Sequence, residues 1–377
     1  MSAPSETLRA LLPAADAFDH LASAGARFAL QSSAAFARWS QGLPPVALAF
    51  GPASAHEVVE DGELARLVRY PSRSAGPGRP LVVVASLINR YYVLDLLPEL
   101  SVIGRLCESG FDVYVLDWKA PGARGPELGF GDYVDGAIAG AVTRAGGGKP
   151  VALLGYCMGG TLAAMYAARH PSTVQALCLL GTPIDFHASG DLAKWTERER
   201  FDADLLMDVY GNMPPSLMQA GFKLMKPGDA LGKMMRMHQE AKDEASLRHL
   251  VALEAWLEDN IAFPGGVYRA YIRELYQDNA LIGGTMRIAG APVELGRITA
   301  PLLNVVALRD HICAPPSSRA LMDLTGSTDR RLLEFDTGHI GLTTSKRAHE
   351  KLWPEVCAWL SEHTAEARAP RSKRDSA

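Results

Sequence analysis

The sequence is poor in features that would place it outside a reducing compartment. Its 377 residues include five cysteines, an odd number, and no two of them form a CxxC pair. This usage argues against a disulfide framework and against a zinc site. No uninterrupted apolar run reaches about 18 residues, so no transmembrane helix is expected. The first residues lack a basic start followed by an apolar run, which argues against a secretory signal. We therefore expect a cytoplasmic protein.

The chain also lacks a strong excess of charge of either sign. Its formal net charge is −4, which gives no reason to expect nucleic acid as a partner. Hydrophobic residues make up 48% of the chain, an ordinary globular composition. Local basic patches can coexist with this total, so an acidic ligand such as a CoA thioester is not excluded. The length suits one large domain or two ordinary ones.

Apolar periodicity divides the chain into four parts. Residues 1–55 predict an N-terminal helical extension and a linker, which we expect to pack on the domain or, alternatively, to contact a lipid-like or polymer surface. In residues 56–182 and 300–365, strand patterns alternate with helical ones, which is typical of a mostly parallel sheet covered by helices on both faces. Residues 183–299 carry helical patterns and predict a large helical cap inserted into the sheet topology. Residues 366–377 form a basic tail that we expect to be disordered.

Compact apolar runs mark the expected strands of the sheet. These runs are short and bounded by turn residues, as strands buried on both faces are. The predicted strands are residues 66–70, 81–86, 111–118, 150–157, 174–182, 300–311 and 330–336, and residues 93–110 predict a helix between the second and third of them.

The segment LLGYCMGG carries the first chemistry, because it places a cysteine in a G-x-C-x-G-G turn between a buried strand and a helix. This is the nucleophile elbow of the α/β-hydrolase fold with Cys157 in place of serine. Side chains at Gly155 or Gly159 would collide with the tight turn. The Met158 N–H, at the start of the helix, can face a developing oxyanion. A glycine-rich turn with a buried structural cysteine is the alternative interpretation, and the strand–turn–helix context disfavours it.

The partners of a nucleophile in this fold follow it along the chain, each after a later strand. Asp310 is predicted to end one such strand, and His339 follows the next. Both would lie at the carboxyl edge of the sheet, where α/β proteins place their sites. We therefore predict a catalytic triad of Cys157, Asp310 and His339, with the cap inserted before the strand that bears the aspartate. His311 is a weaker alternative to His339.

Several other groups are weaker candidates for a role in the active site. By analogy with the fold, the second oxyanion N–H should come from the loop after the strand at residues 81–86, from Leu87 or Ile88. His187 begins the cap and could line the pocket. Cys313 is near the site in sequence but lacks an elbow, and the remaining cysteines fit core positions.

At these residues the sequence resembles the polyhydroxyalkanoate synthases, most closely the short, two-subunit type called class III. The resemblance runs from about residue 56 to about residue 362, and the combination of segments is far more specific than the elbow. The matching segments are SLINRYYVLDLLPELS, GFDVYVLDWKAPG, GYCMGG, LGTPIDF, VYGNMPPSLMQAGFKLMKP, YRAYIRELYQDNALIGG, ITAPLLNVVALRDHICAPPSSRAL and GHIGLTTS.

This resemblance implies an acyltransferase that polymerises (R)-3-hydroxyacyl-CoA, typically 3-hydroxybutyryl-CoA, into a polyester and releases CoA. Cys157, Asp310 and His339 match the family's nucleophile, aspartate and histidine. No cofactor or metal is implied, because the CoA thioester is the substrate. The implied partners are the growing polyester chain, a helper subunit and a second copy in a homodimer, and the implied location is the surface of polyester granules.

Two features depart from the family pattern. Met158 stands where many two-subunit members have Gln, and the apolar N-terminal extension is unusually long for class III. Both put dependence on a helper subunit in question. The competing functions are a Cys-dependent hydrolase or thioesterase similar to dienelactone hydrolases, which share G-x-C-x-G-G, and a non-catalytic granule-associated protein.

Overall fold

The computed structural model describes residues 24–44, 46–225, 235 and 237–365. The predictions for the first part of the N-terminal extension, at residues 1–23, and for the basic tail, at residues 366–377, lie outside the described residues.

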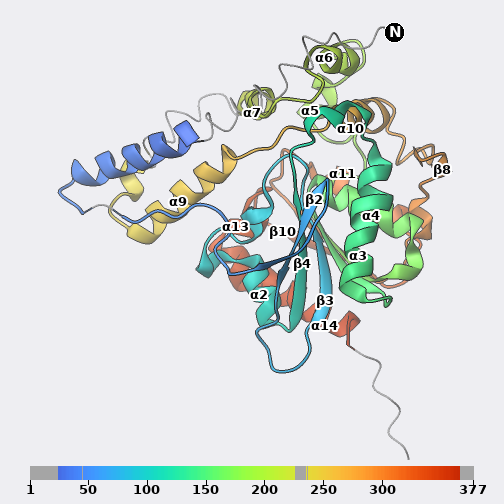
Figure 1. The fold of residues 1–377 in the computed structure, drawn as a ribbon, viewed down its shortest axis with the longest axis horizontal. Coiled ribbons are helices and arrows are strands. Elements are labelled where there is room, and N and C mark those ends of the chain that lie inside the picture. The colour runs from blue at the N-terminus through green and yellow to red at the C-terminus, as the bar shows by residue number, and fades with distance from the viewer. Residues whose placement is uncertain (1–23, 45, 226–234, 236, 366–377) are drawn as a thin grey trace, which may run out of the picture.

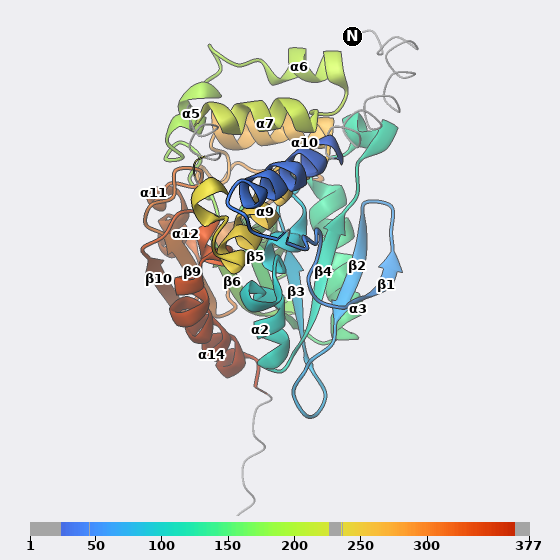
Figure 2. The same ribbon diagram turned by 90° about the vertical axis from the view of Figure 1, so that its left-hand side faces the viewer.

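The described residues form one eight-stranded sheet in the order β1-β2-β4-β3-β5-β6-β9-β10 (Figures 1 and 2). The pairs β1–β2 and β2–β4 are antiparallel, and the neighbours from β4 to β10 are parallel. This confirms the predicted mostly parallel sheet. The alternation of hydrophobicity did not predict β1, because most of its residues are exposed. The strands are β1 (Glu57–Asp61), β2 (Ala65–Tyr70), β3 (Arg79–Val84), β4 (Phe111–Trp118), β5 (Val151–Tyr156), β6 (Val174–Leu180), β9 (Leu302–Ala307) and β10 (Arg330–Phe335).

Helices cover both faces of the sheet, so the central strands are buried throughout. On one face, α2 (Val102–Glu108) and α14 (Trp353–His363) pack against β4 and β6. On the other face, α3 (Ala139–Gly146) and α4 (Met158–Arg169) pack against β3 and β5. Every residue of β5 and β9 is buried. Burial on both faces explains why these strands read as continuous apolar runs.

The predicted helix over residues 93–110 is wrong in its first half. The chain instead forms two 3₁₀ turns, η1 (Tyr91–Leu94) and η2 (Pro98–Leu100), before α2 begins. Pro98 supplies no N–H to a continuing helix. Ser101 is extended, and its side chain accepts a hydrogen bond of 2.7 Å from the Gly104 N–H, which caps α2.

The chain between β6 and β9 covers the carboxyl edge of the sheet (Figures 1 and 2). It is mainly helical, as predicted for the cap. It also contains a β-hairpin of two very short strands, which the hydrophobic periodicity did not predict. Its described elements are α5 (Asp191–Trp195), α6 (Ala203–Tyr210), α7 (Pro215–Leu224), α9 (Glu244–Leu257), α10 (Gly265–Ala270), the π-helix η6 (Tyr271–Gln277), β7 (Arg287–Ile288) and β8 (Ala291–Pro292).

The described part of the N-terminal extension contains a helix over residues 24–39 that lies along α9 (Figure 2). Its inner face packs the apolar side chains Leu30, Ala34 and Ala37 into a separate cluster with residues of α9. The helix therefore packs on the cap, whereas Ser54, in the linker, bonds Asp95 of the core. The remaining short helices of the core are η3 (Gly122–Glu127), η4 (Asp132–Ile138), η5 (Pro171–Thr173), η7 (Leu295–Arg297), α11 (Pro315–Arg319), α12 (Leu321–Leu324), α13 (Gly341–Thr344) and η8 (Ala348–Leu352).

Candidate active site

Cys157 occupies a strained turn between β5 and α4. Its φ of 56° and ψ of −131° lie in a region that residues with a side chain rarely adopt. The surrounding backbone holds this conformation, because the Cys157 N–H donates to Leu180 O and the Cys157 carbonyl accepts from the Gly160 N–H, both at 2.9 Å. The thiol is free and partly exposed, so the strain presents the sulfur at the edge of the sheet.

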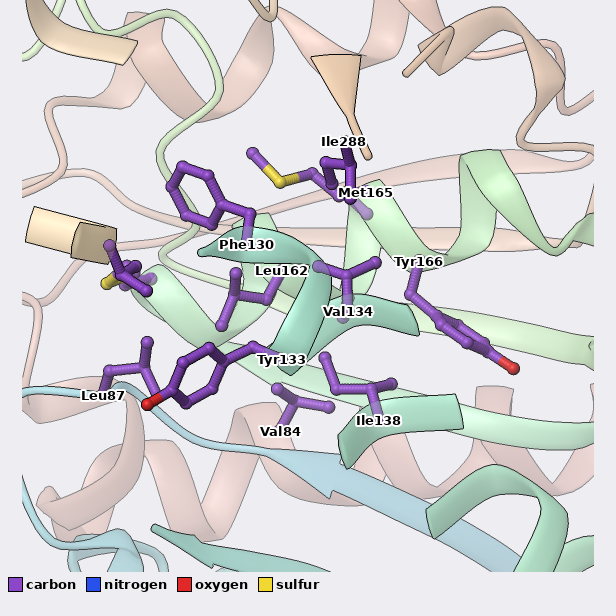
Figure 3. Close-up of a cluster of buried hydrophobic side chains, with 14 of the residues drawn as sticks. Val84, Leu87, Phe130, Tyr133, Val134, Ile138, Leu162, Met165, Tyr166 and Ile288 are labelled. Carbon is purple, nitrogen blue, oxygen red and sulfur yellow. The ribbon is translucent and has the colours of Figure 1, made fainter. Parts of the chain in front are cut away.

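Two elbow glycines are required by close backbone approach. A Cβ on Gly155 would lie 2.4 Å from the Gly160 Cα, and a Cβ on Gly159 would lie 2.2 Å from Val84 O. The second contact brings the end of β3 against the first turn of α4. Figure 3 shows the apolar packing beneath it, where Leu162 of α4 lies in the same cluster as Val84 and Tyr133. The sequence pattern of the elbow thus reflects real steric limits.

Asp310 lies in the turn after β9, three residues beyond the last strand residue, Ala307. The prediction that Asp310 ends the strand is therefore wrong by three residues. The regular strand ends at Ala307, and beyond it the N–H groups of Leu308 and Arg309 donate to Phe335 O and Thr337 O, each at 2.9 Å. The carboxylate is buried, and its Oδ1 accepts from the N–H groups of Ile312 and Cys313, each at 2.9 Å.

His339 is buried beside this carboxylate. Its Nδ1 lies 2.6 Å from Asp310 Oδ2, and the imidazole is near enough to Cys157 for the charge of the sulfur to act on it. The Tyr156 ring stacks on the imidazole with ring centroids 5.2 Å apart. A Cβ added to Gly181 would lie 3.2 Å from His339 Nδ1. The structure thus brings together the three residues that the sequence analysis selected, and it holds the imidazole by contacts on several sides.

The charges around His339 favour its protonated form. Burial lowers the pKa of the imidazole, but the negative charge available on Cys157 and the hydrogen bond to Asp310 outweigh burial and raise the pKa of His339 to about 10. An imidazolium can neutralise a thiolate beside it and can return a proton to a leaving group. Cys157 and His339 can therefore act as an activated nucleophile and its base.

The two candidates for the second oxyanion N–H differ in the structure. The Ile88 N–H donates to Ser86 Oγ at 3.2 Å, so it already has an acceptor. This contact favours Leu87 over Ile88 as the group that could act with the Met158 N–H. Leu87 is buried and lies close to Tyr133 (Figure 3).

The other polar candidates are less well placed. His311 is exposed, and the Asp310 side chain bonds His339 instead. His187 is also exposed and contacts Gln277 O at 3.3 Å, away from the triad residues. Cys313 is buried, and burial together with Asp310 raises the pKa of its thiol well above the usual range. A thiol held neutral in this way is a poor nucleophile.

An aromatic group from the cap side covers the site, and periodicity alone did not identify it. Phe186 packs edge-on against Tyr271 and Tyr276, with centroid distances of 5.6 and 4.9 Å. Burial, the neighbouring Tyr276 and the charge of Cys157 raise the pKa of Tyr271 well above its usual value. The Tyr271 hydroxyl therefore stays protonated, and the side chain is buried in a hydrophobic cluster that Cys157 also contacts. The nearest signal in the sequence is the density of tyrosines in YRAYIRELY.

The described residues give no sign of other site types. No cluster of three or more His, Cys, Asp or Glu side chains among them could hold a metal ion. None of the helices described is both long and apolar enough to cross a membrane.

Comparison with known families agrees with this geometry. Residues 80–345 match the alpha/beta hydrolase fold family, and residues 48–106 match the poly-beta-hydroxybutyrate polymerase (PhaC) N-terminus. The chain is 34% identical over 347 residues to the poly(3-hydroxyalkanoate) polymerase subunit PhaC of Haloarcula marismortui, covering 87% of this chain and 73% of the relative. It is 36% identical over 304 residues to the subunit of the same name from Allochromatium vinosum, covering 78% of this chain and 85% of the relative.

Solved structures support the fold alone. A soluble variant of monoglyceride lipase from Saccharomyces cerevisiae superposes with a TM-score of 0.53 at 13% identity, covering 84% of this chain and 97% of the lipase. A putative non-heme bromoperoxidase, BpoC from Mycobacterium tuberculosis, gives a TM-score of 0.50 at 18% identity, covering 81% of this chain and 98% of that one. On the strength of the sequence matches, this chain belongs to the poly(3-hydroxyalkanoate) polymerase family and has an α/β-hydrolase fold.

Proposed function

We propose that this chain polymerises (R)-3-hydroxyacyl-CoA, with 3-hydroxybutyryl-CoA as the expected substrate, through a thioester on Cys157. Family membership supports the reaction, and the route is supported by the strained elbow that carries Cys157 and by the 2.6 Å contact between His339 and Asp310. No cofactor is needed, because the CoA thioester already carries an activated acyl group.

In the loading step, His339 takes the proton of the Cys157 thiol, and the thiolate attacks the carbonyl carbon of the CoA thioester. The N–H groups of Met158 and Leu87 would stabilise the oxyanion. When the intermediate collapses, the C–S bond to CoA breaks and His339 gives its proton to the departing CoA sulfur. One thioester replaces another of similar energy, so loading is close to reversible and the acyl group keeps its activation.

In the elongation step, a 3-hydroxyl group attacks the carbonyl of an acyl thioester and loses its proton to a base. An ester bond forms, and the C–S bond of the thioester breaks. Asp310 either orients His339 or assists this hydroxyl. Its 2.6 Å contact with His339 Nδ1 allows the carboxylate to orient the ring and, through the ring, to assist the hydroxyl, and two backbone N–H groups hold the carboxylate in place.

The cap suits a transfer that must avoid hydrolysis. Phe186, Tyr271 and Tyr276 are buried together on the cap side of the site, and in this proposal they limit the access of bulk water to a thioester on Cys157. A hydrolase would need water at the same thioester. The cover of aromatic side chains is therefore the observation that favours transfer to an alcohol over hydrolysis.

The experiment is incubation of the purified chain with (R)-3-hydroxybutyryl-CoA, with free CoA, 3-hydroxybutyrate and insoluble polyester measured together. Release of CoA with polyester supports the proposal. Release of CoA with free acid alone would instead identify a thioesterase. Cys157→Ala is the control, because a non-catalytic granule protein would keep its function after that change.

The same assay addresses the partners and location. We propose a homodimer, a helper subunit as in the two-subunit synthases, and a location at the surface of polyester granules, all by family analogy. Polyester formation by this chain alone, with no lag at low concentration, would contradict the need for a helper. Sedimentation of the chain before and after substrate addition tests both the dimer and the association with polymer.

A further inference from the structure

The loop that follows β3, residues 85–92, is held from two sides. On the core side, Trp118 Nε1 donates to Ala85 O at 3.0 Å, and Ala85 O lies against Gly159 at the start of α4. This contact fixes the beginning of the loop relative to the elbow. Leu87, the candidate oxyanion donor, comes two residues later, so its N–H also depends on what fixes the other end of the loop.

The cap holds that other end through main-chain contacts. The Ile261 N–H donates to Ile88 O at 3.3 Å, and Trp256 Nε1 donates to Arg90 O at 2.7 Å. Asn89 and Asn260 form an antiparallel bridge and also a side-chain hydrogen bond. Residues 88–90 of the loop are thus paired with the segment that follows α9.

Asp259 joins this pairing to a third part of the molecule. Its Oδ2 accepts a 2.7 Å hydrogen bond from the Tyr92 hydroxyl and lies 2.5 Å from an Arg27 guanidinium nitrogen. Its Oδ1 lies 3.8 Å from Arg90 Nε. The carboxylate is mostly buried, with a side-chain exposure of 14%. One carboxylate of the cap therefore contacts both the N-terminal helix and the loop after β3.

From these contacts we propose that Asp259 and Asn260 are positioning residues that hold the Leu87 N–H in the oxyanion hole. Closure of the cap would then assemble the hole, and the N-terminal helix would contribute through Arg27. This inference deepens the proposed function, since it assigns a purpose to the cap in acyl transfer to Cys157. A small displacement of an oxyanion donor is costly, because the donor must meet the charge where it develops.

The test compares two reactions of the same sulfur in the full chain. Acylation of Cys157 by p-nitrophenyl acetate passes through an oxyanion, whereas alkylation by iodoacetamide does not. Asp259→Asn and Tyr92→Phe should slow the acylation burst about tenfold, less than complete loss of an oxyanion donor costs. Both should leave the alkylation rate unchanged. Arg27→Met should have a smaller effect in the same direction.

Tyr166→Phe is the matched control. It also removes one tyrosine hydroxyl from a hydrogen bond, the 2.9 Å contact with Thr173 Oγ1 at the far end of α4. This variant should change neither rate. Acylation that is equally fast in Asp259→Asn and in the parent chain would overturn the inference, and so would parallel loss of both rates, which would mean a general disturbance of Cys157.

The outcome is separable from the proposed function. A parent chain that shows the acylation burst but makes no polyester from 3-hydroxybutyryl-CoA would overturn the proposed function and leave the positioning role intact. A parent chain that polymerises while Asp259→Asn shows a normal burst would overturn only the positioning role. A parent chain that is alkylated but never acylated would contradict the oxyanion hole itself.

Discussion

The sheet edge and the cap contribute to one site by different physical means. At the sheet edge, Cys157 and Asp310 follow the buried strands β5 and β9, and His339 follows the more exposed edge strand β10, so backbone geometry sets their positions. The cap supplies surroundings instead, through the aromatic side chains of Tyr271 and Tyr276. Substitutions at the sheet edge should therefore remove the reaction, whereas substitutions in the cap should alter which nucleophile, water or alcohol, reaches the thioester.

The largest expected effect comes from removal of the Cys157 sulfur at the sheet edge. Cys157→Ala should abolish CoA release, because no other group on the site can form the thioester. Cys178→Ala is a suitable control, since that thiol is fully buried in β6. The control should remain active with a small loss of stability. CoA release by Cys157→Ala at the rate of the parent chain would contradict the role of Cys157 as the nucleophile.

Substitutions of His339 and Asp310 should affect the loading and elongation steps differently. His339→Gln should nearly eliminate both loading and elongation, because both need its proton transfer. Asp310→Asn should slow elongation strongly while acylation of Cys157 remains detectable. Rapid-quench measurement of bound acyl groups alongside polymer yield would distinguish the steps. Equal loss of both steps in Asp310→Asn would mean that the carboxylate acts only by orienting His339.

Gly181→Ala tests whether the site tolerates a methyl group beside the imidazole. The φ at Gly181 is +51°, and the new Cβ would lie 3.2 Å from His339 Nδ1. Gly147, at φ +54° with no atom within 4 Å of its ideal Cβ, gives the matched control. Both alanines should cost about 1 kcal/mol of folding stability through backbone strain. Only Gly181→Ala should also reduce the turnover rate, and equal activity of the two variants would refute the contact.

Asn279 offers a test of whether the cap keeps water from the thioester. This residue has a φ of +47°, and its side chain bonds the Asp185 carboxylate and the Phe186 N–H, at 2.9 and 3.0 Å. Asn279→Gly keeps the backbone conformation accessible and frees Phe186. We expect a larger share of free 3-hydroxybutyrate relative to polyester, because water gains access.

Asn212→Ala provides the control for that experiment. Asn212 also ties the cap to a core loop, by donating to Gly122 O at 2.7 Å, but it does not contact Phe186. It should lower stability by about 1 kcal/mol without changing the product ratio. A product ratio unchanged in Asn279→Gly would show that the aromatic group is not the barrier to water.

The smallest expected effect concerns acid stability of the loop that carries His339. His349 is buried, accepts from Arg105 Nε at 2.8 Å and donates to Thr343 O at 2.7 Å. Burial and the charges of Arg105 and His249 lower its pKa from the ordinary value of 6.5. Since the folded state resists protonation, the stability is present above pH 6.5 and is lost as the pH falls below it.

Thermal unfolding between pH 5 and pH 7.5 checks this sign. Because the raised pKa of His339 acts in the opposite sense above pH 6.5, the check is the difference between the two chains: as the pH falls from 6.5 to 5, His349→Gln should lose less stability than the parent chain. The pKa of His249 is also lowered, chiefly by burial, so part of the pH dependence should remain in the variant. A steeper acid loss in His349→Gln would contradict the assignment.

The alternating core, the elbow and the three triad candidates could be predicted from the amino-acid sequence. Local rules carry that information: burial on both faces makes strands such as β5 continuously apolar, and the tight turn admits only glycine at Gly155 and Gly159. The order of Cys157, Asp310 and His339 along the chain then follows from the fold.

The side chains that surround the three triad candidates could be identified only in the folded structure. Tyr156, Gly181 and the contacts of Asp259 come from segments far apart in sequence, so no periodicity reveals them. The irregular start of α2 depends on Pro98 and on a hydrogen bond from Gly104 to Ser101, which override the helical pattern around them. Local patterns report what one element buries, whereas long-range contacts arise only when the folded sheet brings separate loops to the same edge.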